Sequence, residues 1–161
     1  MTGQIKGLHH VTAMSRDADA NNRFFTSTLG LRRVKKTVNF DEPSVYHLYY
    51  GDEAGTPGTV MTYFPFPHII RGRPGTGEVG ETVFSVPEGS LKFWQDRFAA
   101  EGVEGISVDE RFGEKRLRFK AVDGDMFAVA EIGNDPRAAW TGGTIAGDEA
   151  IRGFHGASLR L

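Results

Sequence analysis

The chain has 161 residues, and its 19 Lys and Arg against 21 Asp and Glu give a formal net charge of −2. This near balance offers no electrostatic attraction for nucleic acid or for a membrane surface, so we predict neither partner. Because the sequence contains no cysteine, disulfides and thiolate metal sites are excluded. There is neither a signal-peptide core nor an apolar run of membrane-spanning length, and we therefore expect a cytoplasmic protein.

Residues 1–67 predict a first β-α-β-β-β unit. Ser15 and Asp17 offer N-cap chemistry for a helix that runs to about Leu29. The next strand alternates apolar and basic residues, which is typical of a strand with one wet face, and its irregular spacing indicates a bulge. The four strands are expected at 8–14, 31–40, 45–50 and 59–66.

Residues 78–133 repeat this order after a linker at 67–80 that is rich in Gly and Pro. Ser90 is the expected N-cap of a helix whose core face carries Trp94 and Phe98. The four strands of this second unit are expected at 81–86, 106–111, 115–121 and 126–132.

The end of the chain echoes its beginning, because His155 follows His10 by about two repeat periods. Residues 134–149 are expected to be irregular, and 151–161 to be the first strand of a truncated third unit, left without a partner. Such repeats predict an α+β fold in which each βαβββ unit forms a half-barrel sheet. A half-barrel has open edges and must pair with another unit, and two paired units enclose a concave ligand pocket.

Six stretches form a more specific pattern: 8–12 (Leu-His-His-Val-Thr), 30–41, 46–59, 90–94 (Ser-Leu-Lys-Phe-Trp), 111–113 (Arg-Phe-Gly) and 152–155 (Arg-Gly-Phe-His). The repeated unit resembles the vicinal oxygen chelate superfamily, which includes glyoxalase I, bleomycin-resistance proteins and extradiol ring-cleaving dioxygenases. The six stretches resemble the N-terminal half of the hydroquinone-type ring-cleaving dioxygenases. This resemblance covers essentially the whole chain.

The resemblance implies a partial metal site. Members of that family typically have four units in one chain, and two histidines and one glutamate hold ferrous iron, a ligand set suited to oxygen chemistry. His10 matches the first ligand, whereas the other two belong to a fourth unit that has no counterpart here. Fe(II) is thus implied for a full-length member, with Mn(II) or no metal as alternatives for this chain. The implied ligands are a small aromatic substrate and dioxygen, and the implied partner is a second copy or a missing C-terminal half.

Other side chains are candidates for the substrate pocket. Thr59, Met61 and Tyr63 share one face of a predicted strand and are expected to line the pocket. His47 is a further pocket candidate, with exposure to solvent as the alternative. His9 is expected to point away from the face of His10, because neighbouring residues of a strand alternate. His155 is expected to be a core or edge histidine, and the sequence identifies no catalytic residue.

Three functions are therefore considered. The first is the N-terminal half of an Fe(II)-dependent extradiol-type ring-cleaving dioxygenase for hydroquinone-like or catechol-like aromatics, incomplete on its own. The second is a non-catalytic, dimeric small-molecule-binding protein of the bleomycin-resistance type. The third is a metal-dependent glyoxalase-like lyase, which requires more carboxylates than the first two units offer at the expected strand positions.

Overall fold

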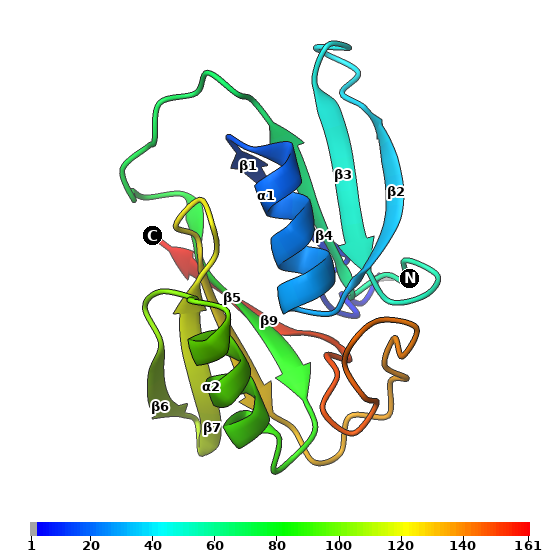
Figure 1. Cartoon of the computed structure of the whole chain (residues 1–161), viewed down its shortest axis with the longest axis vertical. Helices are drawn as coiled ribbons and strands as arrows, with labels where there is room; N and C mark the ends of the chain where they lie inside the picture. The colour runs from blue at the N-terminus through cyan, green and yellow to red at the C-terminus, as the bar shows by residue number, and fades with distance from the viewer. Residues whose placement is uncertain (1–2) are drawn as a thin grey trace.

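A computed structural model describes residues 3–161 and contains two sheets with few helices, the α+β fold expected from the sequence (Figure 1). The first sheet has the order β1-β4-β3-β2, in which β1 runs parallel to β4 and the other pairs are antiparallel. Its elements are β1 (His10–Ser15), α1 (Ala18–Arg23), a π-helical turn η1 (Phe24–Thr28), β2 (Arg32–Val38), β3 (Tyr46–Gly51) and β4 (Val60–Pro65).

Local chemistry accounts for the start of α1 and the irregularity of β2. The carboxylate of Asp17 accepts hydrogen bonds of 2.9 Å from the amides of Asp19 and Ala20, which is the predicted N-cap. The predicted bulge lies between Arg33 and Lys35, where the register against β3 shifts.

The second sheet has the order β6-β7-β8-β5-β9. Ser90 is the N-cap residue of α2, as predicted, but its hydroxyl donates to the carbonyl of Pro87 at 2.6 Å and makes no hydrogen bond to the first turn of the helix. The carboxylate of Glu131 accepts from the amide of Leu91 at 3.1 Å and takes over this role. The elements are β5 (Glu78–Val86), α2 (Leu91–Ala100), β6 (Ser107–Arg111), β7 (Glu114–Lys120), β8 (Met126–Glu131) and β9 (Gly153–Arg160).

The last strand, β9, differs from the expectation that residues 151–161 lack a partner. It pairs antiparallel with β5, and only its other edge is open. The irregular segment 134–149 was correctly predicted: it contains no strand or helix and leads into β9.

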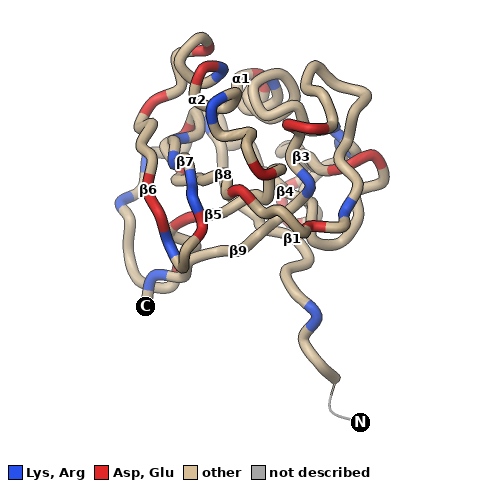
Figure 2. Tube along the Cα trace, turned by 90° about the horizontal axis from the view of Figure 1, so that it is seen from below, with Lys and Arg blue, Asp and Glu red and all other residues tan. Residues whose placement is uncertain are grey.

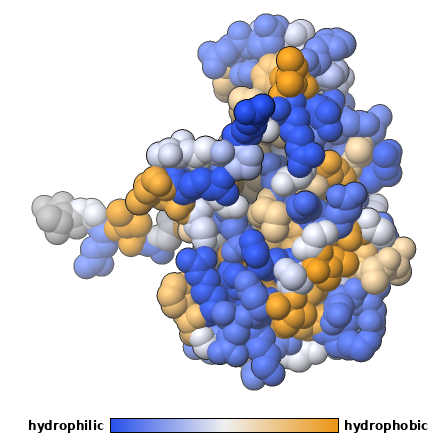
Figure 3. All heavy atoms as spheres, turned by 90° about the vertical axis from the view of Figure 1, so that its left-hand side faces the viewer, coloured by the Kyte–Doolittle hydropathy of each residue, from blue (hydrophilic) through white to orange (hydrophobic). Residues whose placement is uncertain are grey.

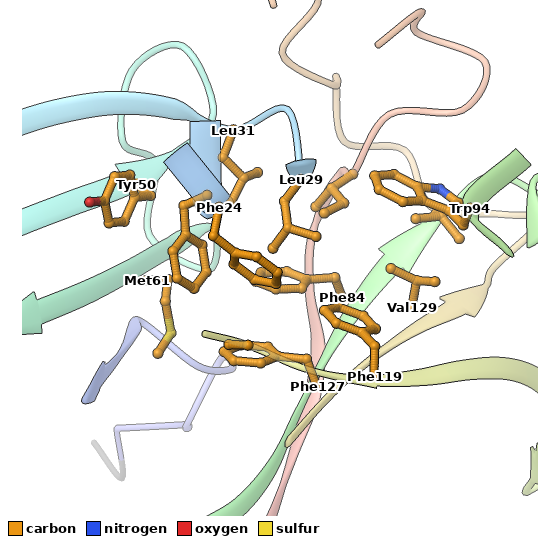
Figure 4. Close-up of a cluster of buried hydrophobic side chains, with 14 of the residues drawn as sticks. Phe24, Leu29, Leu31, Tyr50, Met61, Phe84, Trp94, Phe119, Phe127 and Val129 are labelled. Atoms are coloured by element: carbon orange, nitrogen blue, oxygen red, sulfur yellow. The ribbon is translucent and has the colours of Figure 1, made fainter. Parts of the chain in front are cut away.

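The two sheets share one hydrophobic core, and no strand of one pairs with a strand of the other among residues 3–161. Phe25 of η1 lies 5.0 Å from the ring of Tyr63 in the first sheet and 5.9 Å from that of Phe127 in the second. Figure 4 shows this cluster, to which both sheets and the helical turn contribute. Each buried aromatic ring stabilises the fold by about 1.5–3 kcal/mol. Packed side chains fill the interior between units one and two, and a surface cavity of about 550 Å³ lies beside this core, lined by residues of both units that include Arg23, Thr28, Glu101 and Lys120.

The surface is mixed in hydropathy. On the face drawn in Figure 3, hydrophilic residues predominate and hydrophobic ones are interspersed among them. No helix in the described part of the chain is both long and apolar enough to span a membrane.

Candidate functional site

His10 lies on the face of the first sheet that points away from the core. Val11 is buried and pairs with Met61, so these two residues define the core face. By strand alternation, His10 and Thr12 point to the opposite side. We call this side the open face of the first sheet. It comprises His10, Thr12, Met14, His47, Tyr49, Thr62 and Phe64.

The environment of His10 contains a second imidazole. The Nδ1 atoms of His9 and His10 lie 3.0 Å apart, and the two rings are nearly perpendicular with centroids 5.1 Å apart. His9 precedes the first residue of β1, where strand alternation no longer applies. The expectation that His9 points away from His10 therefore does not match the structure. Neutral imidazoles offer nitrogen lone pairs to a metal ion, and both rings are exposed.

Next to these residues, His47 and Tyr49 form a hydrogen-bonded pair. Burial lowers the pKa of His47, and the charges of His10 and Lys35 lower it further. Burial raises the pKa of Tyr49. The hydroxyl of Tyr49 and Nδ1 of His47 lie 2.7 Å apart and share a hydrogen bond, whose donor depends on the tautomer of the imidazole.

The imidazole of His47 is held between two aromatic rings. Its centroid lies 3.9 Å from that of Phe64 and 4.1 Å from that of Tyr49. Its Nε2 atom is buried and has no hydrogen-bond partner among residues 3–161. His47 thus lies on the same face as His10, in contact with the rings of Phe64 and Tyr49.

The other three predicted pocket residues lie elsewhere. Thr59, Met61 and Tyr63 share a face, as predicted, but it is the core face and all three are buried. The hydroxyl of Tyr63 donates to Oδ2 of Asp125 at 3.0 Å, across the junction of the two units. The hydroxyl of Thr59 donates to the carbonyl of Thr56 at 2.9 Å. The structure therefore does not bring these residues together with His10.

The described residues supply only part of a metal site. No three His, Asp or Glu side chains within residues 3–161 lie close enough together to hold a metal ion. An exposed histidine at the start of a strand fits the role of a single ligand, and His9 places a second nitrogen beside it. The described residues can therefore supply some of the ligands of a metal ion, but not a complete set.

The second sheet has a different chemistry on its corresponding face. Arg116 is buried and donates to Glu81 and Asp109 at 2.8 Å each, and Arg118 donates to Glu81 at 2.7 Å. Figure 2 shows acidic and basic residues along β6 and β7, where this network lies. His155 lies on the edge strand β9 and its Nε2 is 2.7 Å from a carboxylate oxygen of Glu114. The charged side chains of this face therefore pair with one another.

Comparison with protein families gives one match, which covers residues 7–130. The matching family is described as the Glyoxalase/Bleomycin resistance protein/Dioxygenase superfamily. Among curated proteins, the chain is 47% identical over 158 residues to one from Bacillus subtilis named "Putative ring-cleaving dioxygenase MhqE". It is 36% identical over 156 residues to the chlorohydroquinone/hydroquinone 1,2-dioxygenase of Sphingobium indicum.

These similarities cover nearly all of this chain but only part of each relative. They span 97% and 94% of the chain against 51% and 49% of the two relatives, so the chain spans about half their length. A crystal structure described as a putative dioxygenase from Bacillus subtilis superimposes with a TM-score of 0.90 at 42% identity, over 95% of this chain and 49% of that one. A glyoxalase family protein from Enterococcus faecalis, at 18% identity and a TM-score of 0.62, shares the fold.

Proposed function

Because the chain belongs to the Glyoxalase/Bleomycin resistance protein/Dioxygenase superfamily, we propose that it forms half of a ring-cleaving dioxygenase. The proposed enzyme depends on Fe(II) and acts on hydroquinone-like or catechol-like aromatics. The observation that carries this proposal is the position of His10, an exposed imidazole on the first strand of the first sheet. The relatives named as ring-cleaving and hydroquinone dioxygenases support the reaction class.

In this proposal the open face of the first sheet holds both metal and substrate. His10 contributes one metal ligand, and the ligands still needed come from outside residues 3–161. Ferrous iron, when bound, supplies electron transfer between an aromatic diol and dioxygen.

The neighbouring side chains suit a planar aromatic ring. On the same face as His10, the ring of His47 is stacked on that of Phe64 and tilted against that of Tyr49. The hydroxyl of exposed Thr12, which shares a hydrogen bond of 2.8 Å with that of buried Thr62, adds a polar group that can hold a substrate hydroxyl. These contacts orient the ring and keep water away from one side of it.

The test joins this chain to the C-terminal half of MhqE and measures oxygen uptake with hydroquinone in the presence of Fe(II). We expect stoichiometric oxygen consumption by the joined protein and none by the 161-residue chain alone. His10→Ala should abolish the activity, whereas His68→Ala, which changes an exposed histidine of the linker, should leave it unchanged. An active His10→Ala protein would contradict the assignment of His10. Tight binding of hydroquinone without metal or turnover would favour the non-catalytic binding protein instead.

A further inference from the structure

A surface cavity lies where the two units meet, on the side of the first sheet that α1 covers. Its volume is about 550 Å³, which is within the range of small-molecule sites. Three parts of the chain line it: α1 with η1, the linker, and the end of α2 together with the turn between β7 and β8. Figure 1 shows α1 and α2 on the same side of the molecule. A ligand in this cavity would therefore contact both units at once.

Hydrogen bonds between the two units hold the walls of the cavity together. The hydroxyl of Thr28 in η1 donates to a carboxylate oxygen of Glu101 at 2.9 Å, and Nε of Arg97 donates to the carbonyl of Thr28 at 2.8 Å. The carboxylate of Glu101 also forms an ion pair with Arg97 at 3.6 Å. Within unit two, the amide of Lys120 donates to the carbonyl of Glu104 at 2.8 Å. The walls are thus formed without a ligand, and the charge of Glu101 is balanced within the protein.

The cavity has an excess of positive charge. Its cationic side chains are Arg23 at the end of α1, Arg71 in the linker and Lys120 at the end of β7. None of the three forms an ion pair with another residue of the described chain. Besides Glu101, the lining contains the carboxylate of Glu104. Three positive charges against this one negative charge leave an excess of two, so the cavity favours an anion of charge about −2.

Two glycines give two of these cations their positions. The guanidinium of Arg71 lies against Gly124, where a Cβ would overlap it. The aliphatic stem of Lys120 lies over Gly105, where a Cβ would be 3.0 Å from Cγ of the lysine. The two glycines have φ values of 94° and 70°, a region of backbone conformation that favours glycine. The local backbone therefore leaves room for both cationic side chains beside the cavity.

The inner part of the cavity is apolar. Phe24 and Ala121 line it and are buried, and Val103 is half-buried against the same core. The ring of Phe24 lies 6.3 Å from that of Phe119, so this part of the lining continues into the core. An inorganic ion would leave the apolar lining in contact with water, whereas a ligand with an apolar body would cover it.

We propose that this cavity binds a small organic dianion, an apolar body that carries either a phosphate group or two carboxylates. The anionic groups pair with Arg23, Arg71 and Lys120. The apolar body lies against Phe24. Because the bound ligand contacts both units and the linker, it should also stabilise the fold. The open face that carries His10 is on the other side of the first sheet, and the inference does not rest on the proposed function.

Isothermal titration calorimetry of the 161-residue chain with phenyl phosphate tests this proposal, and we expect one bound ligand per chain. Phenol lacks the charge and inorganic phosphate lacks the ring, so each should bind at least about tenfold more weakly. Phthalate carries its charge on two carboxylates. Tighter binding of phthalate assigns the site to dicarboxylates, and tighter binding of phenyl phosphate assigns it to phosphate esters. Equal binding of phenol or of inorganic phosphate overturns the proposal, as does the absence of saturable binding of both dianions at millimolar concentrations.

Substitutions of the cations test the position of the site. Arg71→Ala and Lys120→Ala should each raise the Kd about tenfold or more, because each removes a charged partner of the ligand. Arg73→Ala in the same linker and Lys115→Ala in the same strand are matched controls, because neither side chain lines the cavity. All four side chains are exposed, so the variants should keep the melting temperature of the unmodified chain. Equal losses in the controls would attribute binding to net charge and overturn the proposal.

NMR provides a second measurement that needs no substitution. The amide signals of Gly102 and Gly124, which line the cavity, should shift on titration with phenyl phosphate. Those of Gly113 and Gly156, which lie in the second sheet away from the cavity, should not shift. Shifts at Gly156 or on the open face of the first sheet, without shifts at the cavity, would place the ligand elsewhere and overturn the proposal.

Discussion

The hydroxyl of Tyr63 makes one of the hydrogen bonds that join the two units. The side chain is fully buried in the core and donates to Oδ2 of Asp125 at 3.0 Å. Burial raises the pKa of Asp125, the hydrogen bond from Tyr63 lowers it, and the charge of Asp123 raises it. Tyr63→Phe removes the one group in the described chain that donates to this carboxylate from the first sheet.

The expected loss follows from the strength of such bonds. A hydrogen bond to a charged group contributes about 1.5–3 kcal/mol, so Tyr63→Phe should lower the free energy of unfolding by about 2 kcal/mol at pH 7. Because the native pKa of Asp125 lies above its unfolded value, protonation stabilises the native state, and stability decreases as pH rises through the native pKa. Removing the hydroxyl raises that pKa further. The cost of Tyr63→Phe should therefore be greater at pH 7 than below pH 3.8.

Urea unfolding followed by tryptophan fluorescence measures this difference. Tyr50→Phe is the matched control, because Tyr50 is equally buried in the same sheet and its hydroxyl has no partner among residues 3–161. Its removal should change stability by less than about 0.5 kcal/mol, or increase it. A Tyr63→Phe cost that does not change with pH, or that matches the Tyr50→Phe value, would refute the reasoning.

Three further changes test other parts of the fold. Phe112 is exposed and has a φ of 56° in a two-residue hairpin turn, a backbone conformation that asparagine adopts more readily. Phe112→Asn should therefore raise the free energy of unfolding in urea by about 1 kcal/mol. A lower free energy of unfolding would show that the phenylalanine ring makes a stabilising contact. Arg116→Met should lower the free energy of unfolding by about 3 kcal/mol, because it leaves buried Glu81 with one partner fewer. Lys92→Met breaks an exposed ion pair and should leave the free energy of unfolding almost unchanged. Equal losses for the two variants would contradict the role of burial. In NMR titration His47 should titrate below pH 6.5, since its native pKa is lowered and its protonation destabilises the fold; titration above 6.5 would contradict its burial beside Tyr49.

Local features were predicted from the sequence because each depends on a few adjacent residues. The cap at Asp17 needs only a carboxylate followed by free amides, and the bulge in β2 follows from a break in alternation. The repeated order of elements fixed the α+β class. Ser90 was correctly predicted as the N-cap residue of α2, but the first amide of the helix donates to a distant carboxylate, that of Glu131, and not to the Ser90 hydroxyl. A single sequence carries no signal for that long-range contact.

The face of β4 was not predictable from alternation. Five of its six residues are buried, so both faces are apolar and the period of two does not identify the core side. The pairing of Met61 with buried Val11, and not with exposed His10, settles which face packs inward. The same limit applies to His9: its ring lies beside that of His10 because the strand has not yet begun, and element boundaries are the least certain part of a sequence prediction.

The residues that pack in the core and the residue proposed to bind a metal lie on opposite faces of the first sheet. The two sheets bury the faces that carry Tyr63 and Phe127 against Phe25 of η1, and these contacts involve no residue of the open face. His10 lies on the opposite side of β1, where its side chain is exposed. Selection for a stable half and selection for a complete metal site therefore act on different residues of the same strand. The metal chemistry proposed for His10 therefore needs donor groups that the core packing of residues 3–161 does not supply.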